Sequence, residues 1–223
     1  MNDTLLMVMN PRAIPECIDA IRELRGVDKA WMQYMTEIEL VDVVARIIAN
    51  TKYERYMILS DDCVPSQRSL DLVLDVHAEN PDGLVCAWIN VDNASDRTTV
   101  HPTPLRDLDY PTEDSYAFLT IDEVGELPRE PLRVYFHGCN LAVMNRDLWD
   151  AYPFGVYDAG FASDYHQCVR LQLGGVPIWT HPDALVYHVK EVQNQLDKAP
   201  EKQLLIGKRA PRVTIERETP WAG

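Results

Sequence analysis

The feature that most constrains the fold is an alternation of short apolar runs with amphipathic stretches over the first ninety residues. Residues 4–9, TLLMVM, form an apolar run typical of a buried strand. Residues 30–35 and 56–59 repeat this pattern, and residues 84–91 give a fourth strand. Strands that alternate with helices predict right-handed crossovers and a mainly parallel central sheet with helices on both faces. The chain is therefore expected to belong to the α/β class.

Helix-start signals stand between these runs. Pro15 suits a first helical position, and Thr36 with Glu39 has the T-x-x-E form of a capping box. Ser66 is expected to cap the third helix, which residues 80–83, NPDG, bring to an end. These signals divide the stretch into strand–helix–strand units.

The pattern changes after residue 91. Residues 92–133 contain five prolines and many acidic residues, and we interpret them as a long excursion with one short helix or strand. Residues 134–144 are expected to form a strand that runs through FHGCN, and residues 163–173 a helix capped by Ser163. The other elements expected here are a helix at 146–151 and strands at 176–179 and 184–189.

Length and composition fit one domain, residues 1–190, followed by a polar C-terminal tail at 191–223. The formal net charge of −14 disfavours a broad nucleic-acid-binding face, which needs basic residues. Five scattered cysteines without a CxxC pair argue against a disulfide framework or a zinc ribbon and predict a reducing, cytoplasmic location. No apolar run reaches about 18 residues, and no basic start precedes the first apolar run, so neither a membrane span nor a signal peptide is expected.

Two adjacent carboxylates, Asp61 and Asp62, directly follow the third strand. In parallel sheets, ligands bind beyond the carboxyl ends of the strands. Like charges in contact cost free energy unless a cation or water stands beside them, and Mg²⁺ or Mn²⁺ commonly takes one or two carboxylates plus substrate phosphates. Adjacent aspartates also form turns and helix caps, so the pair alone leaves both roles open.

Two further side chains lie where chemistry is expected. His188 ends the last predicted strand, and imidazole suits Mn²⁺ better than Mg²⁺; a solvent-facing histidine is the alternative. Asp164 is expected in the first turn of the helix at 163–173, where the helix dipole favours the carboxylate form that a general base needs. Aspartate is also common at this position for structural reasons.

The segment FHGCN, residues 136–140, places a glycine inside an expected strand. Gly138 indicates a bulge or a close approach of the backbone to a ligand. A nucleophilic pair of Cys139 and His137 would need side-chain contact. The distance between side chains two residues apart on a strand does not suit proton transfer. A packed cysteine is therefore favoured at this position.

The order of these segments, MVMNPR, then LSDDCVP, then the block from FHGCN to ALVYH, resembles the GT-A glycosyltransferases, particularly the inverting family-2 type. The resemblance covers roughly residues 4–91 and 134–189. It implies a single GT-A (Rossmann-like) domain in which the excursion is the variable, acceptor-side region. It also implies metal-dependent transfer of a sugar, with inversion, from a nucleotide-diphosphate donor to an acceptor hydroxyl. Mn²⁺ or Mg²⁺ is the implied metal, and a UDP-sugar is the favoured donor.

The resemblance also implies residue roles. Asp164 would deprotonate the acceptor hydroxyl, and a metal held by Asp62 and His188 would stabilise the leaving diphosphate. The residues implied to bind the donor are Asn10, Arg12, Asp61, Gly138, Cys139 and Asn140.

The sequence departs from the family pattern at three places. Ser60 stands where the family often has the first aspartate of a DxD motif, and Ser163 stands where a second acid usually precedes the base. The aspartate that usually follows the second strand is not evident, although Thr36 or Glu37 could substitute for it.

These departures keep two alternatives open. One is a non-catalytic relative that binds a sugar nucleotide or a protein. The other is a nucleotidyltransferase, which would normally carry a glycine-rich basic loop after the first strand; MNPRAIPEC lacks one. The sequence leaves the oligomeric state open, and the acceptor could be a glycan, a metabolite, a protein or a modified nucleic acid.

Overall fold

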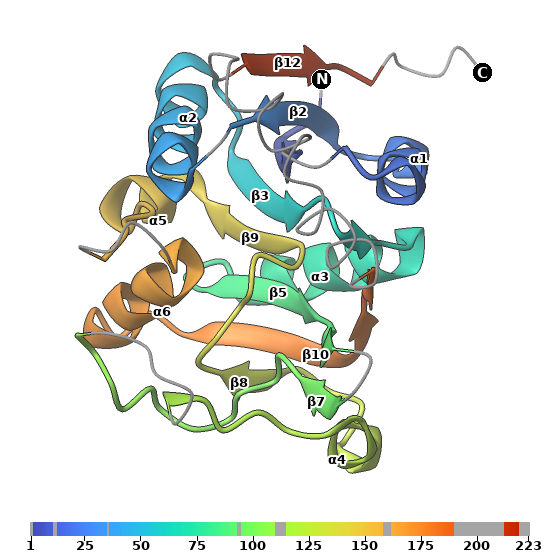
Figure 1. Cartoon of the computed structure of the whole chain (residues 1–223), viewed down its shortest axis with the longest axis vertical. Coiled ribbons are helices and arrows are strands. Elements are labelled where there is room, and N and C mark those ends of the chain that lie inside the picture. The colour runs from blue at the N-terminus through green and yellow to red at the C-terminus, as the bar shows by residue number, and fades with distance from the viewer. Residues whose placement is uncertain are drawn as a thin grey trace, which may run out of the picture.

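An eight-stranded sheet forms the centre of the protein, with strand order β12-β2-β1-β3-β9-β5-β10-β8 (Figure 1). The structure is a computed structural model. It describes residues 2–10, 13–34, 36–92, 95–109, 115–157, 162–189 and 212–218. Within these residues, no helix is long and apolar enough to cross a membrane.

The elements of the fold have the following bounds. The strands of the large sheet are β1 (Thr4–Met9), β2 (Asp28–Gln33), β3 (Arg55–Ser60), β5 (Leu84–Trp88), β8 (Leu132–Val134), β9 (Ala142–Asn145), β10 (Ile178–Leu185) and β12 (Arg212–Glu216). Two small sheets pair β4 (Cys63–Val64) with β11 (Tyr187–His188), and β6 (Asn90–Asp92) with β7 (Ser95–Thr98). The helices are α1 (Pro15–Glu23), α2 (Glu37–Asn50), α3 (Gln67–Glu79), α4 (Ile121–Glu126), α5 (Arg146–Ala151) and α6 (Ser163–Leu173).

Five strands of the large sheet run in the same direction. They are β2, β1, β3, β5 and β10, whereas β12, β9 and β8 run the opposite way. Because strand–helix–strand crossovers join most of the parallel strands, the mainly parallel α/β class predicted from the sequence is confirmed.

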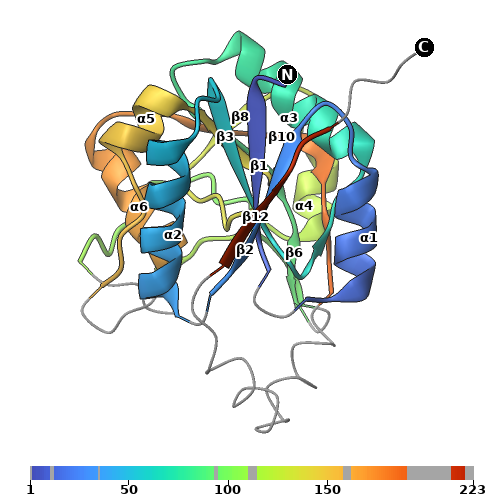
Figure 2. The same cartoon turned by 90° about the horizontal axis from the view of Figure 1, so that it is seen from above.

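Helices cover both faces of the sheet (Figure 2). Successive side chains of a strand point to opposite faces, so Leu5 and Met7 pack in the core layer of α2, α5 and α6. Leu6 and Val8 pack in the layer of α1 and α3. Each fully buried side chain of this kind contributes about 2 kcal/mol relative to an exposed one.

The direction of the crossovers reverses at the centre of the sheet. From β1 the chain crosses through α1 to β2 on one side, whereas from β3 it crosses through α3 to β5 on the other. A reversal of this kind opens a crevice beyond the carboxyl ends of the two strands, where α/β proteins bind ligands. Asn10 follows β1 at this crevice, and Asp61 follows β3.

Two of the predicted helix caps are confirmed and one is wrong. The side chain of Thr36 accepts from the backbone N–H of Glu39 at 3.2 Å, and Ser66 accepts from Ser69 at 3.1 Å. Ser163, however, is the first residue of α6, and the N-cap is Ala162, whose φ of 60° lies in the left-handed region. Because alanine has no polar side-chain atom, the sequence does not predict Ala162 as the N-cap.

The strand expected over residues 134–144 is interrupted. β8 ends at Val134 and β9 begins at Ala142. Between them Gly138, Cys139 and Leu141 have φ of 54°, 56° and 47°. Left-handed residues cannot continue a strand, so FHGCN forms a turn instead.

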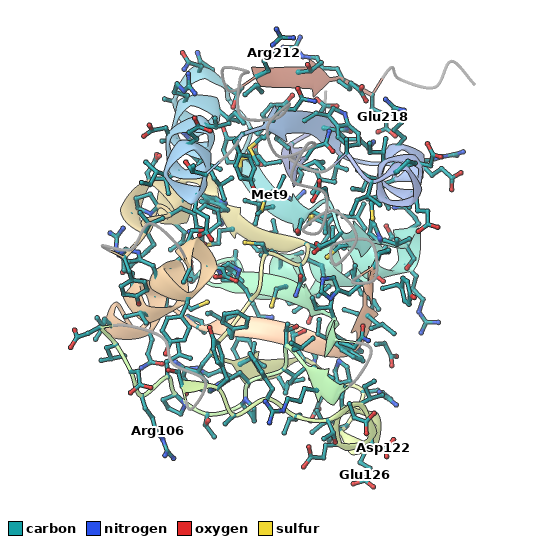
Figure 3. All side chains as sticks on the ribbon, in the orientation of Figure 1. Met9, Arg106, Asp122, Glu126, Arg212 and Glu218 are labelled. Atoms are coloured by element: carbon teal, nitrogen blue, oxygen red, sulfur yellow. The ribbon has the colours of Figure 1, made fainter. Side chains whose placement is uncertain are left out.

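The C-terminal half contains more strand than expected. The strands predicted at 176–179 and 184–189 appear as β10, which runs from Ile178 through Leu185, and the short β11. The excursion holds the end of β6 together with β7 and α4. Residues 212–216 of the predicted tail form β12, which pairs with β2 at the edge of the large sheet. Figure 3 shows Arg212 and Glu218 at that end of the molecule and Arg106 at the other. Residues 191–211 of the tail lie outside the described residues.

Candidate functional site

Six segments meet at the carboxyl edge of the sheet. β1 and β3 end there, and β11 follows the end of β10. β9 runs antiparallel to β3, so the turn before β9 lies at the same edge. Because α2 follows β2 and α6 precedes β10, both helices have their N-termini at this edge. The fold therefore brings together, in one region, most of the side chains that the sequence predicts to be functional.

Asp62 and His188 are in direct contact although 126 residues separate them in the chain. Nε2 of His188 lies 3.0 Å from Oδ2 of Asp62, and both side chains are buried. The short pairing of β4 with β11 sets His188 opposite Cys63, and the backbone N–H of Val189 donates to the carbonyl of Asp62 at 2.7 Å. The backbone thus fixes this pair before any ligand binds.

Ser60 supports the same carboxylate. Its hydroxyl donates to Oδ1 of Asp62 at 2.6 Å, and the thiol of Cys63 lies 3.7 Å from the same oxygen. Ser60 therefore orients the carboxylate of Asp62 through a neutral hydrogen bond.

The donor set of this pair fits a divalent cation. An octahedral ion with bonds of about 2.1 Å holds adjacent ligand atoms about 3 Å apart, which matches the 3.0 Å between Asp62 and His188. Carboxylate and imidazole together suit Mn²⁺. Within the described part of the chain, no group of three or more His, Cys, Asp and Glu side chains is arranged to hold a metal ion. Among the described residues, Asp62 and His188 are therefore two candidate ligands, and a metal ion held there would need further ligands from other groups, substrate or water.

Asp61 and Asn10 lie at the crevice between β1 and β3. Asp61 is fully buried, and its Oδ2 accepts from the backbone N–H of Ala13 at 3.1 Å, which ties the loop after β1 to the end of β3. Ala13 has a left-handed φ of 55°. Oδ1 of Asn10 is buried and has no hydrogen-bond partner among the residues that the structure describes. Arg12 lies outside those residues.

The turn at 137–141 lies between this pair and α6. The carbonyl of Cys139 accepts from the backbone N–H of Ser60 at 3.1 Å, and the N–H of Cys139 donates to Nδ1 of His137 at 3.1 Å. A Cβ on Gly138 would come within 2.9 Å of Nδ2 of Asn140, so the turn requires glycine both for its φ and for space. Strained backbone of this kind gathers at functional sites.

The side chains of Cys139 and Asn140 are buried within the turn. Nδ2 of Asn140 donates to Thr99 at 3.2 Å and thereby ties the turn to the excursion. Burial raises the pKa of the Cys139 thiol well above its usual range. A thiol held in the protonated form is a poor nucleophile, so the packed-cysteine interpretation is favoured over a Cys139–His137 pair.

Asp164 stands in the first turn of α6, as expected, but its charge is disfavoured. Burial and, to a smaller extent, the negative charge of Glu37 raise the pKa of Asp164 to about 6. The hydrogen bond from the backbone N–H of Tyr165 to Oδ1, at 2.7 Å, opposes this shift. Desolvation therefore outweighs the stabilisation that a helix N-terminus gives to a carboxylate.

Glu37 contributes to this region in a way that the sequence did not reveal. Its Oε2 accepts from the backbone N–H of Ser163 at 2.7 Å. From the sequence, Glu37 is expected only as a substitute for a nucleotide-binding aspartate. No local pattern predicts that its side chain bonds the start of a helix 126 residues further along the chain.

Aromatic side chains lie near Asp164. The ring of Tyr116, from the excursion, packs edge-to-face on Tyr165 at 5.4 Å and stacks on Phe118 at 4.8 Å. Burial and the nearby charge of Asp164 both raise the pKa of Tyr116. The excursion therefore brings an aromatic, hydroxyl-bearing residue to the candidate base.

A separate hollow of about 490 Å³ lies at the opposite edge of the sheet. Arg146 is among its lining residues and donates to the carbonyls of Thr51 and Ile48, so its guanidinium is engaged in holding the fold. The other residues that line the hollow are Lys52, Tyr53, Glu54, Asn145 and Asp147. This hollow takes no part in the site described above.

Comparison with known proteins gives a likeness in structure but none in sequence. No family model matches the chain, and no curated protein matches it. Among solved structures, the protein A197 from STIV is similar with a TM-score of 0.54 and 13% identity, over 81% of this chain and 81% of that one. The likeness shows a shared fold and nothing finer.

Two other solved structures are similar at lower scores. They are GalNAc-T7 with UDP, GalNAc and Mn²⁺ (TM-score 0.46, 12% identity, 83% of this chain and 43% of that one) and CMP:2-keto-3-deoxy-manno-octonic acid synthetase with CTP (TM-score 0.48, 10% identity, 90% and 99%). At these scores neither carries an argument about the activity of this chain.

Proposed function

We propose that this protein is a metal-dependent glycosyltransferase of the GT-A type that transfers a sugar, with inversion, from a nucleotide-diphosphate donor to an acceptor hydroxyl. The observation that carries the proposal is the 3.0 Å contact between Asp62 and His188 at the carboxyl end of β3. The pair lies at the crossover reversal, where an α/β sheet binds nucleotides. Cys139 interacts with both regions: its carbonyl accepts from the backbone N–H of Ser60, and burial and the negative charge of Asp164 raise the pKa of its thiol.

The donor would bind across the crevice between β1 and β3. Asp62 and His188 would hold the Mn²⁺ or Mg²⁺ ion, with Asp61 beside them. The ion supplies positive charge to the diphosphate leaving group. The buried side-chain oxygen of Asn10 would accept a hydrogen bond from the nucleobase or the ribose. Gly138, which has no side chain, would permit close approach of the turn to the sugar. A UDP-sugar is the proposed donor.

Asp164 would act as the general base. Its pKa of about 6 leaves it mainly ionised at neutral pH, yet basic enough to accept the proton of a hydroxyl as that hydroxyl attacks the anomeric carbon. Tyr116 and the excursion would form the acceptor side of the site. The domain boundary at residue 190 and the cytoplasmic location belong to this proposal as well.

A thermal-shift panel tests the proposal directly. Wild type and Asp62→Ala would be melted with UDP-, GDP-, dTDP- and CMP-sugars, each with Mn²⁺, with Mg²⁺ and with EDTA. A donor at one hundred times its Kd stabilises the native state by about 2.7 kcal/mol, which raises the Tm of a domain this size by roughly 5 °C or more. We expect that shift for one diphosphate-sugar with metal, and a smaller one in Asp62→Ala.

Two other results would change the assignment. A donor that binds with metal but is never transferred or hydrolysed would favour the non-catalytic relative. The absence of a shift with every donor, in metal and in EDTA alike, would contradict the proposal.

A further inference from the structure

We propose that Glu37 is the positioning residue of Asp164, which it holds in place by capping helix α6 from a distant part of the chain. The inference rests on the proposed function for its catalytic meaning, but the contact on which it depends stands independently. Oε2 of Glu37 accepts the backbone N–H of Ser163, the residue immediately before Asp164, at 2.7 Å.

The backbone N–H of Ser163, at the start of α6, needs a partner that the N-cap residue of the helix does not provide. The first N–H groups of a helix have no partner within the helix, and a side-chain oxygen at the N-cap usually accepts one of them. The N-cap of α6 is Ala162, which has no such oxygen and holds a left-handed φ of 60°. Glu37 takes over this role through Ser163. The backbone that aims Asp164 is thus fixed by a residue of α2.

The fold explains how Glu37 reaches this position. It is the first residue of α2, directly after the cap formed by Thr36. α2 and α6 lie on the same face of the sheet (Figure 2), and both begin at its carboxyl edge. The carboxylate of Glu37 therefore lies near the positive ends of two helix dipoles, which stabilise its charge.

Glu37 also provides a charge beside Asp164. Glu37 supplies a second carboxylate from another element, and its charge raises the pKa of Asp164. Among the described residues, the other titratable groups that interact with Asp164 stay neutral at neutral pH because burial raises their pKa values: Tyr116 of the excursion, Cys139 of the turn, Tyr157 after α5 and Cys168 of α6.

A carboxyl-carbon NMR titration separates positioning from a merely structural role. The protein would be labelled with ¹³C at aspartate carboxyl carbons, and the Asp164 signal would be assigned by its loss in Asp164→Asn. Glu37→Gln keeps an oxygen for Ser163 but removes the charge, whereas Glu37→Ala removes both. Glu39→Gln removes the same charge from the same turn of α2 and is the matched control.

We expect Asp164 to titrate near pH 6 in wild type and in Glu39→Gln, and about half a pH unit lower in Glu37→Gln. The backbone amide of Ser163 should keep its protection from hydrogen exchange in Glu37→Gln and exchange at least about tenfold faster in Glu37→Ala. Unchanged titration of Asp164 in Glu37→Gln would overturn the electrostatic part of the proposal. Unchanged Ser163 protection in a folded Glu37→Ala would overturn the capping part.

These measurements need no donor, acceptor or metal, so their failure differs from failure of the proposed function. If both NMR results are as expected but the protein binds no donor, the interaction of Glu37 with Asp164 is supported and the transferase proposal is contradicted. Donor transfer that is equally fast and has the same pH profile in wild type and Glu37→Gln would retain the transferase and remove Glu37 from its mechanism.

Discussion

The two aspartates central to the proposed mechanism, Asp62 and Asp164, are held in opposite ways. Asp62 accepts from the hydroxyl of Ser60 and touches the imidazole of His188, so polar groups meet its charge on both oxygens. Asp164 has a backbone bond from Tyr165, but burial disfavours its charge, and the carboxylate of Glu37 acts in the same direction. The first environment suits a group that stays charged beside a cation, and the second suits a group that takes up a proton.

The strongest test of this difference is the loss of the base. Asp164→Asn keeps the shape of the side chain and an oxygen that can bond the backbone N–H of Tyr165. It cannot take up the proton of the hydroxyl that attacks the sugar. We expect transfer in single-turnover assays to fall by about 10²- to 10⁴-fold, while donor affinity by calorimetry stays within about twofold. Asp122→Asn, in the first turn of α4 at the far end of the sheet, should leave both unchanged. Equal turnover in Asp164→Asn would remove the residue from the mechanism.

The complementary substitution acts on the other aspartate. Asp62→Ala removes a carboxylate that we place on the metal and leaves His188 without its partner. Metal-dependent donor binding should weaken by at least about tenfold, measured by calorimetry with Mn²⁺ and with EDTA. Asp82→Asn, an exposed aspartate in the turn before β5, serves as the control. A mutant with wild-type Mn²⁺ dependence would contradict the metal assignment.

A third change tests the turn that connects the two regions. Gly138→Ala places a Cβ at 2.9 Å from Asn140 and forces alanine to a φ of 54°. The free energy of unfolding should fall by about 1–2 kcal/mol in urea denaturation. Gly125→Ala in α4 meets no atom within 4 Å and should stabilise the protein by about 0.5 kcal/mol or leave it unchanged. Equal effects of the two substitutions would show that the turn is not strained.

The smallest expected effect is a pH-dependent gain in the free energy of unfolding when Asp164 is replaced by asparagine. Because the folded state raises the pKa of Asp164 from 3.8 to about 6, the folded protein binds this proton more tightly than the unfolded chain. Wild-type stability from this group therefore falls as pH rises from about 4 to 6 and stays lower above that range. Asp164→Asn should be more stable than wild type by about 1 kcal/mol at pH 8, less than the full shift implies because the side chain is partly exposed.

Urea denaturation of both proteins at pH 4.5 and at pH 8 measures this effect. The difference should shrink towards the lower pH, where wild-type Asp164 is largely protonated. A difference that is the same at both pH values would show that Asp164 carries no burial penalty.

Much of the fold followed from local patterns, and the errors have a common cause. The bounds predicted for β1 match those observed, and the caps at Thr36 and Ser66 were identified. The strand predicted through FHGCN was wrong because apolar content favoured a strand, whereas left-handed residues and their tertiary hydrogen bonds made a turn. The N-cap at Ala162 was missed because alanine has no polar side chain, and the N–H of Ser163 is bonded instead by Glu37 of another helix.

The sequence by itself determined the layers of this protein, since hydrophobic periodicity and capping act between residues a few positions apart. It also placed Asp61, Asp62, Asp164 and His188 at element ends. Only the tertiary structure decided how these groups meet. The contacts of Asp62 with His188 and of Glu37 with Ser163 each span 126 residues. Such pairings depend on crossover direction and on burial, which no local pattern contains, and they set the different environments of Asp62 and Asp164.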